Sequence, residues 1–95
     1  MALRSLELKN QIDSKKRELV ENERKFEGFS TREAELIEKV NTADSDEART
    51  AVETEIEEFN EEKAGVEAEI TALRESIAQM EEELQKMEEA EPSKE

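Results

Sequence analysis

The sequence predicts an all-α protein, an antiparallel hairpin of two long helices that pack as a coiled coil. Of its 95 residues, 44% are charged and only 34% are hydrophobic, too few apolar residues for an ordinary globular core. Two glycines and one proline leave little material for the turns of a β-sheet protein. Apolar residues recur at alternating steps of three and four, which is the pattern of a coiled-coil seam.

The weaker of two such repeats predicts the first helix, at about 3–41. Lys15, Asn22 and Glu33 are its polar members. The segment EGFST at 27–31 contains Gly28, and glycine weakens a helix by about 1 kcal/mol. Because the repeat keeps its phase through this segment, we expect a kink or a frayed turn near 28–31 and no reversal. The apolar seam residues are Leu8, Ile12, Leu19, Phe26, Phe29, Leu36 and Val40.

The chain is expected to reverse between the two repeats, because they are out of phase with each other. The segment NTADSDEAR at 41–49 offers Asp44 as a helix N-cap, with Glu47 three residues later as the second half of a capping box. A short connection between long helices makes them antiparallel neighbours. The predicted turn residues are Asn41, Thr42, Ala43 and Asp44.

The stronger repeat predicts the second helix, at about 45–91, which closes before Pro92. Residues 1–91 would then form one helical-hairpin domain, followed by a polar tail at 92–95. Only one member of this repeat, Lys63, is polar. The seam residues are Val52, Ile56, Phe59, Lys63, Val66, Ile70, Leu73, Ile77, Met80, Leu84 and Met87.

A turn centred near residue 43 also predicts how the two helices are aligned. Phe26 and Phe29 would lie beside Phe59 and Ile56, which gathers all three aromatic residues in one cluster. The same alignment would place Lys63 near Asn22 and Glu23 and leave Met87 beyond the end of the first helix. A polar layer of this kind specifies the register of a coiled coil at some cost in stability.

The charge of the chain is concentrated in its second half. Residues 1–41 contain nine basic and nine acidic side chains, whereas residues 42–95 contain five and nineteen, a net charge of −14. Such a surface should repel nucleic acid and anionic lipid. The one basic cluster, KKR at 15–17, is interpreted as a solvated helix face with i,i+4 pairs of Asp13 with Arg17 and Glu21 with Lys25.

The composition argues against an enzyme and predicts no cofactor and no metal site. Without histidine, cysteine, tyrosine or tryptophan, the usual nucleophile and base pairs cannot form. A calcium loop counted from Asp44 would place Arg49 where glycine makes the turn, so a helix cap explains these acidic residues better. No apolar run approaches the ~18 residues of a membrane span, and no targeting segment is recognisable, so a soluble chain is expected.

Some apolar residues lie outside the predicted seam, namely Leu3, Leu6, Val20 and Ile37. A lone two-helix rod buries little apolar surface for its length, and its stability should be marginal. We therefore expect self-association or docking on a larger body.

Three stretches resemble a known family: the N-terminal MALRSLELKNQIDSKKREL, the middle TREAELIEKV, and EARTAVETEIEEFNEEKAGVEAEITALRESIAQMEEEL. They are similar to the scaffolding segment, or delta domain, of Hong Kong-type tailed-bacteriophage major capsid proteins, over nearly the whole chain. The resemblance implies a helical segment that precedes the shell domain, promotes assembly of procapsids from within, and is then removed by the maturation protease. Its partners would be other copies and capsid shell domains. Its location would be the procapsid interior in the bacterial cytoplasm, and this chain would be the excised segment.

Two other functions remain open. One is a free-standing coiled-coil adaptor or chaperone-like hairpin that binds a protein client with its tip, and the other is an acidic regulator that mimics DNA. A shell domain encoded directly after EPSKE would favour the scaffold, whereas a stop codon there would favour the adaptor. Competition with DNA for a basic partner would identify the mimic.

Overall fold

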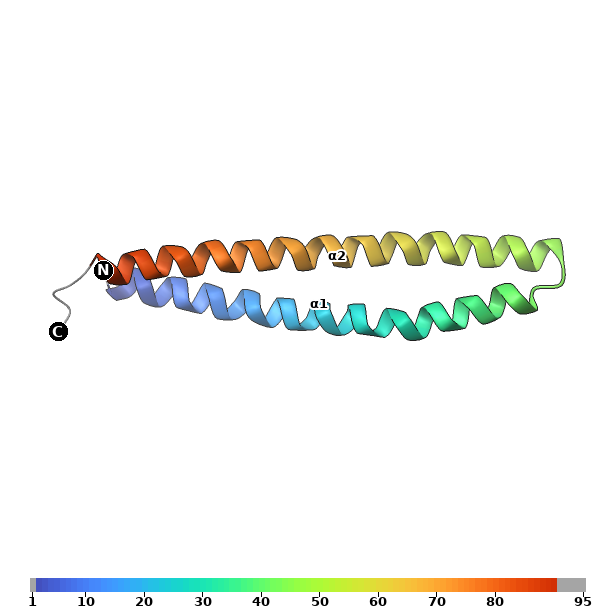
Figure 1. The fold of residues 1–95 in the computed structure, drawn as a ribbon, viewed down its shortest axis with the longest axis horizontal. Coiled ribbons are helices and arrows are strands. Elements are labelled where there is room, and N and C mark those ends of the chain that lie inside the picture. The colour runs from blue at the N-terminus through green and yellow to red at the C-terminus, as the bar shows by residue number, and fades with distance from the viewer. Residues whose placement is uncertain (1, 91–95) are drawn as a thin grey trace.

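The chain folds into two long antiparallel helices, as Figure 1 shows. The computed structural model describes residues 2–90, in which α1 spans Ala2–Thr42 and α2 spans Asp46–Glu89. The rod measures 73 × 15 × 15 Å. The predicted all-α helical hairpin is therefore confirmed, with helix ends within two residues of the predicted ones. The predicted tail at 92–95 lies outside the described residues.

The connection between the helices comprises residues 43–45, and Ser45 is the N-cap of α2. Ser45 has an extended backbone, with φ −142° and ψ 161°, and its Oγ accepts a hydrogen bond from the backbone N–H of Ala48 at 3.1 Å. The prediction that Asp44 caps this helix is wrong by one residue. With Ser45 at the cap, Asp46 and Glu47 both occupy the first turn, where carboxylates stabilise the helix dipole.

Replacing the cap tests this assignment directly. Ser45→Ala should lower the free energy of unfolding by about 1 kcal/mol. The change removes the acceptor for the Ala48 N–H, which has no partner within the helix. Asp44→Ala is the matched control and should change stability little, because the Asp44 side chain accepts no bond from residues 2–90. Urea unfolding followed by far-ultraviolet circular dichroism measures both. A larger loss for Asp44→Ala would contradict the assignment.

The first helix is continuous through the EGFST segment, so the structure shows neither a frayed turn nor a reversal there. In Figure 1 the ribbon of α1 bends gently in its teal part. Gly28 has a helical backbone, and a β-carbon built on it would meet nothing within 4 Å. No close contact therefore requires glycine at this position, and a larger side chain would fit there.

The core is a single seam between the two helices. The predicted apolar seam residues are all buried or half-buried except Val40, which is 49% exposed, and Lys63 is half-buried among them. Glu33, one of the polar members of the first repeat, is exposed. The buried members, each 3–8% exposed, are Leu8, Ile12, Phe29, Val52, Phe59, Ile70, Leu73 and Ile77.

The alignment of the helices differs from the predicted one by about one seam step. The connection is centred on residue 44, one residue later than predicted, so Lys63 lies over Phe26 and not beside Asn22 and Glu23. Met87 does not overhang the first helix. It packs against the cluster of Leu8, Ile12 and Ile77, and its sulfur accepts a hydrogen bond from the hydroxyl of Ser5 at 4.0 Å.

Candidate interaction surface

The three aromatic residues form one layer in the turn half of the rod, as predicted. The rings of Phe26 and Phe29 meet edge to face at 6.0 Å, and those of Phe29 and Phe59 do so at 5.5 Å. Edge-to-face pairs add about 0.5–1.5 kcal/mol each beyond the area they bury. The layer therefore joins the two helices at a point where other seam positions are only half-buried.

Two cations cover the aromatic layer. The Lys63 nitrogen lies 5.8 Å from the centroid of Phe26 and 5.9 Å from that of Phe59. The Arg32 guanidinium lies 5.4 Å from the centroid of Phe59 and also donates to Glu62 at 2.7 Å. Cations within about 6 Å of a ring are attracted to its face. The sequence predicts a polar seam layer at Lys63, and the structure adds that its partners are aromatic rings.

Ion pairs link the helices along both edges of the seam at heptad spacing. On one edge, Lys9 pairs with Glu88 at 3.6 Å and Lys16 with Glu81 at 3.0 Å. Lys16 belongs to the KKR cluster and uses an acidic partner from the second helix, whereas Lys15 of the same cluster is half-buried at its seam position. Within residues 2–90, the predicted pairs of Asp13 with Arg17 and Glu21 with Lys25 do not form.

The third pair on this edge has reversed polarity. Glu23 on α1 accepts from Arg74 on α2 at 2.9 Å, one heptad further along from Lys16 and Glu81. If α2 slid by one heptad in the direction that brings Arg74 opposite Lys16, two cations would meet. A slide in the other direction would bring Glu81 opposite Glu23. The reversed pair therefore opposes both slipped registers.

A charge swap tests this role of the reversed pair. Arg74→Glu should destabilise the hairpin by about 1 kcal/mol, because it sets two carboxylates against each other at an exposed edge. Adding Glu23→Arg should restore most of that loss, and a double-mutant cycle should give a coupling of about 0.2–1 kcal/mol. Urea unfolding of the four proteins measures the cycle. Additive effects of the two changes would show that the pair does not couple the helices.

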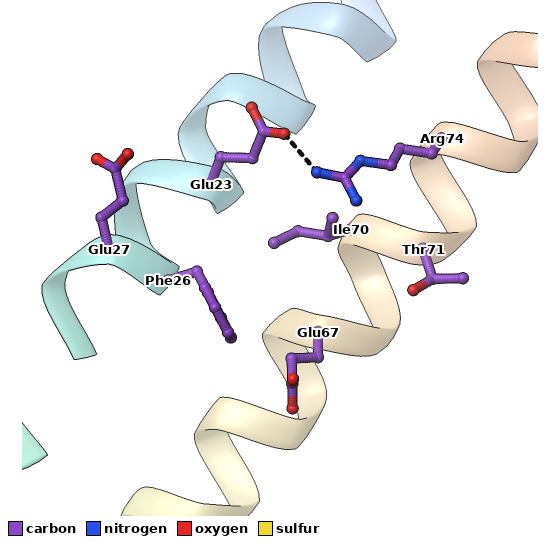
Figure 2. Close-up of a pocket in the computed structure, with 7 residues that line it drawn as sticks. All are labelled: Glu23, Phe26, Glu27, Glu67, Ile70, Thr71 and Arg74. Carbon is purple, nitrogen blue, oxygen red and sulfur yellow. Dashed lines mark hydrogen bonds and ion pairs between the residues drawn. The ribbon is translucent and has the colours of Figure 1, made fainter. Parts of the chain in front are cut away.

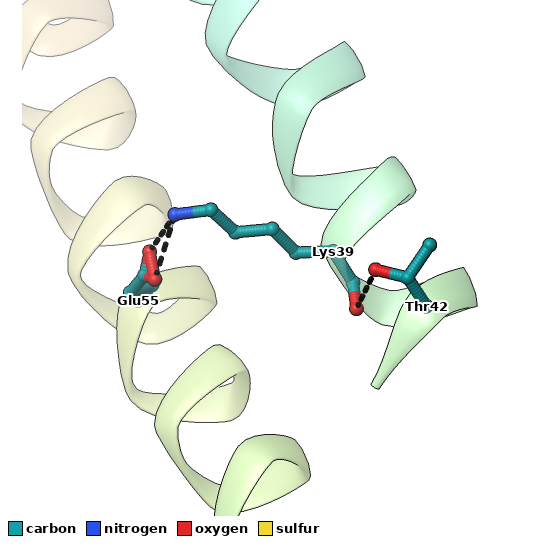
Figure 3. A network of polar contacts seen from close by, with 3 residues as sticks. All are labelled: Lys39, Thr42 and Glu55. Atoms are coloured by element: carbon teal, nitrogen blue, oxygen red, sulfur yellow. Dashed lines mark hydrogen bonds and ion pairs between the residues drawn. The ribbon is translucent and has the colours of Figure 1, made fainter. Parts of the chain in front are cut away.

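The opposite edge carries its ion pairs in the turn half of the rod. Figure 3 shows Lys39 reaching from α1 to α2, where its nitrogen donates to both carboxylate oxygens of Glu55 at 2.7 and 3.1 Å. Arg32 and Glu62 form the neighbouring pair, one heptad away. We call the side of the rod with these two pairs the Arg32 face. It is polar along the part of the rod where the pairs lie.

A cleft of about 510 Å³ opens on the other side of the rod, near its middle. Figure 2 shows Phe26 and Ile70 directed into it from the two helices, beside the Glu23–Arg74 pair. Glu27, Glu67 and Thr71 complete the lining. The cleft thus has an apolar floor and a rim with three carboxylates and one guanidinium, which suits an apolar side chain accompanied by a cation.

A second opening, of about 190 Å³, lies on the same side near the turn. Ile37 and Val40, 56% and 49% exposed, lie at this groove, and Leu36, Ile56 and Phe59 also line it. We call the side with the cleft and the groove the Val20 face, because Val20 shares a heptad position with Glu27 of the cleft and is 44% exposed. Leu6, 55% exposed, lies at that same heptad position.

Two kinds of feature are absent from the described part of the chain. Among residues 2–90, no three acidic side chains are grouped so that they could hold a metal ion. No helix in that range is long and apolar enough to cross a membrane. Comparison of the chain with protein-family models, with curated proteins and with solved structures finds no match.

Proposed function

We propose that this chain is a structural assembly module, a rod that holds copies of a larger protein together while they assemble. The observation that carries the proposal is the Val20 face. A rod 73 Å long has formed its seam, yet Leu6, Val20, Ile37 and Val40 remain 44–56% exposed along one side. Exposed apolar residues that recur along one side of a rod are typical of a surface that other proteins cover.

The layout of the hairpin supports this role. The start of α1 and the end of α2 lie together at the open end, where Lys9 pairs with Glu88, and the turn lies at the far end (Figure 1). A body attached at the open end would carry the rod as a projection with both long sides accessible. This is the layout that a scaffolding segment inside a forming shell requires.

The resemblance to delta domains gives the proposal its specific form. The chain would promote assembly of capsid protein into procapsids, in contact with other copies and with shell domains, and the maturation protease would then remove it. Its place would be the procapsid interior in the bacterial cytoplasm. The net charge of −14 supports removal before packaging, because many such rods would repel incoming DNA.

The test begins with the reading frame that follows EPSKE. If it encodes a shell domain, the parent protein should form shells when expressed whole and should aggregate or form aberrant particles when residues 1–91 are deleted. Electron microscopy and sedimentation distinguish these outcomes. Ser14→Asp, an exposed change away from the Val20 face, is the matched control and should assemble normally. Normal shells from the deleted protein would refute the scaffold.

The turn-end groove favours one alternative, an adaptor or chaperone-like hairpin that binds a protein client with its tip. Its apolar lining lies close to the connection, where a client could reach it without contacting the rest of the rod. Ile37→Asp should abolish client binding in this case, whereas Val20→Asp should leave it unchanged. Equal losses of client binding in both variants would indicate that the client contacts the whole Val20 face and not the tip alone.

A further inference from the structure

The exposed apolar residues of α1 fall on the side of the rod that carries both the cleft and the groove. Leu6 and Val20 share a heptad position with Glu27, which lines the cleft. Ile37 shares its heptad position with Glu23, which lines the cleft too. The Val20 face thus presents two exposed apolar side chains, Leu6 and Val20, which we call its projections. It also contains two openings, the cleft and the groove.

The spacing of the projections matches the spacing of the openings. Leu6 and Val20 are 14 residues apart, about 21 Å along α1 at 1.5 Å per residue. Phe26 in the cleft and Val40 in the groove are also 14 residues apart. In an antiparallel pair of rods, Val20 of one copy would enter the cleft beside Phe26 of the other while Leu6 enters the groove beside Val40. A parallel pair would set projection against projection.

The charges around the cleft fit the same arrangement. Arg17 and Arg24 flank Val20 at i−3 and i+4, and neither forms an ion pair within residues 2–90. When Val20 of one copy enters the cleft of the other, its Arg17 falls opposite residue 29 of the other copy, close to Glu27. Glu27 and Glu67 of the rim also have no cation partner among the described residues. The arrangement therefore pairs arginines and carboxylates that the single hairpin leaves unpaired.

We infer that the partner of the Val20 face is a second copy of this chain, packed face to face and antiparallel about a two-fold axis near Glu23. The contact is isologous, so each copy gives two projections and receives two. A face 73 Å long and 15 Å wide is large enough to hold a standard interface of ~800 Å² per partner. The inference rests on the proposed function, because an assembly rod requires partner copies, and it specifies which surface they share.

Sedimentation equilibrium of the whole chain tests the pairing without any shell domain. The wild type should reach twice its mass of 10.9 kDa in a concentration-dependent manner. Val20→Asp should weaken the association more than about tenfold, because it places a carboxylate in a cleft already lined by three. Ser14→Asp adds the same charge at another exposed position of α1 and should leave the association unchanged.

Circular dichroism of each variant shows whether the hairpin still folds, and Leu6→Asp provides a second disrupting change at the other projection. A wild type that stays monomeric at its highest soluble concentration overturns the inference, as do equal effects of Val20→Asp and Ser14→Asp. These outcomes would leave the assembly role itself intact, because deletion of residues 1–91 from the parent protein tests that role separately.

Disulfide trapping tests the orientation, and the chain suits it because it has no cysteine of its own. Leu6→Cys chains mixed with Ile37→Cys chains should form a cross-linked dimer on oxidation, since Leu6 meets the groove that Ile37 lines. Leu6→Cys chains alone should not cross-link. Efficient cross-linking of Leu6→Cys alone would indicate a parallel pair and overturn the two-fold arrangement.

Discussion

Phe59→Ala is expected to lower the free energy of unfolding by about 3–5 kcal/mol, the largest loss from any single substitution considered for this chain. Phe59 is 3% exposed, its ring meets that of Phe29 edge to face, and two cations lie over it. The substitution opens a cavity and removes these ring contacts together. Urea unfolding, followed by circular dichroism at a fixed protein concentration, measures the change.

Phe26→Ala provides the matched control within the same layer. Phe26 is only half-buried and contacts Phe29 at 6.0 Å, so its loss should cost about half as much as that of Phe59. Equal losses of unfolding free energy at the two positions would show that the burial of a ring does not determine how much it stabilises this seam. A small loss at Phe59 would show that the layer does not hold the turn half of the rod together.

Lys63→Glu is expected to lower the free energy of unfolding by about 2 kcal/mol. The change removes an ammonium from over two ring faces, replaces it with a carboxylate that the ring faces repel, and adds a charge between Glu62 and Glu67. Thermal and urea unfolding measure the effect. A stability equal to that of the wild type would show that the ring contacts of Lys63 contribute nothing.

Lys63→Met separates the charge from the packing at this position. Methionine loses about 0.5–1 kcal/mol of cation–π attraction but buries a fully apolar side chain in the seam, which contributes more, so stability should rise slightly. Spin labels at Asn10→Cys and Lys86→Cys, on opposite helices near the open end, would report the register. A broader distance distribution in Lys63→Met is expected if the polar layer helps to specify alignment.

The helices and their seam could be predicted from the sequence because both depend on short-range periodicity. Steps of three and four place apolar residues on one stripe whatever the partner helix does, and the phase change after Val40 requires a break. The unbroken phase of the first repeat likewise predicts no reversal at Gly28, and α1 is continuous there. These features depend on residues close together in the chain.

The alignment of the helices could not be predicted to the residue, because it depends on which of two adjacent residues caps α2. Asp44 and Ser45 are both good N-caps, and choosing Asp44 displaced the predicted partners of Lys63 by one seam step. The Glu23–Arg74 pair was not predicted either, because an interhelical ion pair depends on how side chains at the edge of the seam reach across it. A signal was present, since Lys9, Lys16 and Glu23 are opposite in charge to Glu88, Glu81 and Arg74, and both series run at seven-residue steps.

The placement of both helix ends at one end of the rod also determines how the hairpin responds to force. A load applied between the start of α1 and the end of α2 opens the seam like a zipper, breaking the Lys9–Glu88 pair first and meeting the aromatic layer late. A load applied along the rod, from the open end to the turn, would instead be carried along the backbones of the helices and would not pull the seam apart. The hairpin should therefore be mechanically weak to peeling at its open end and strong to stretching along its length.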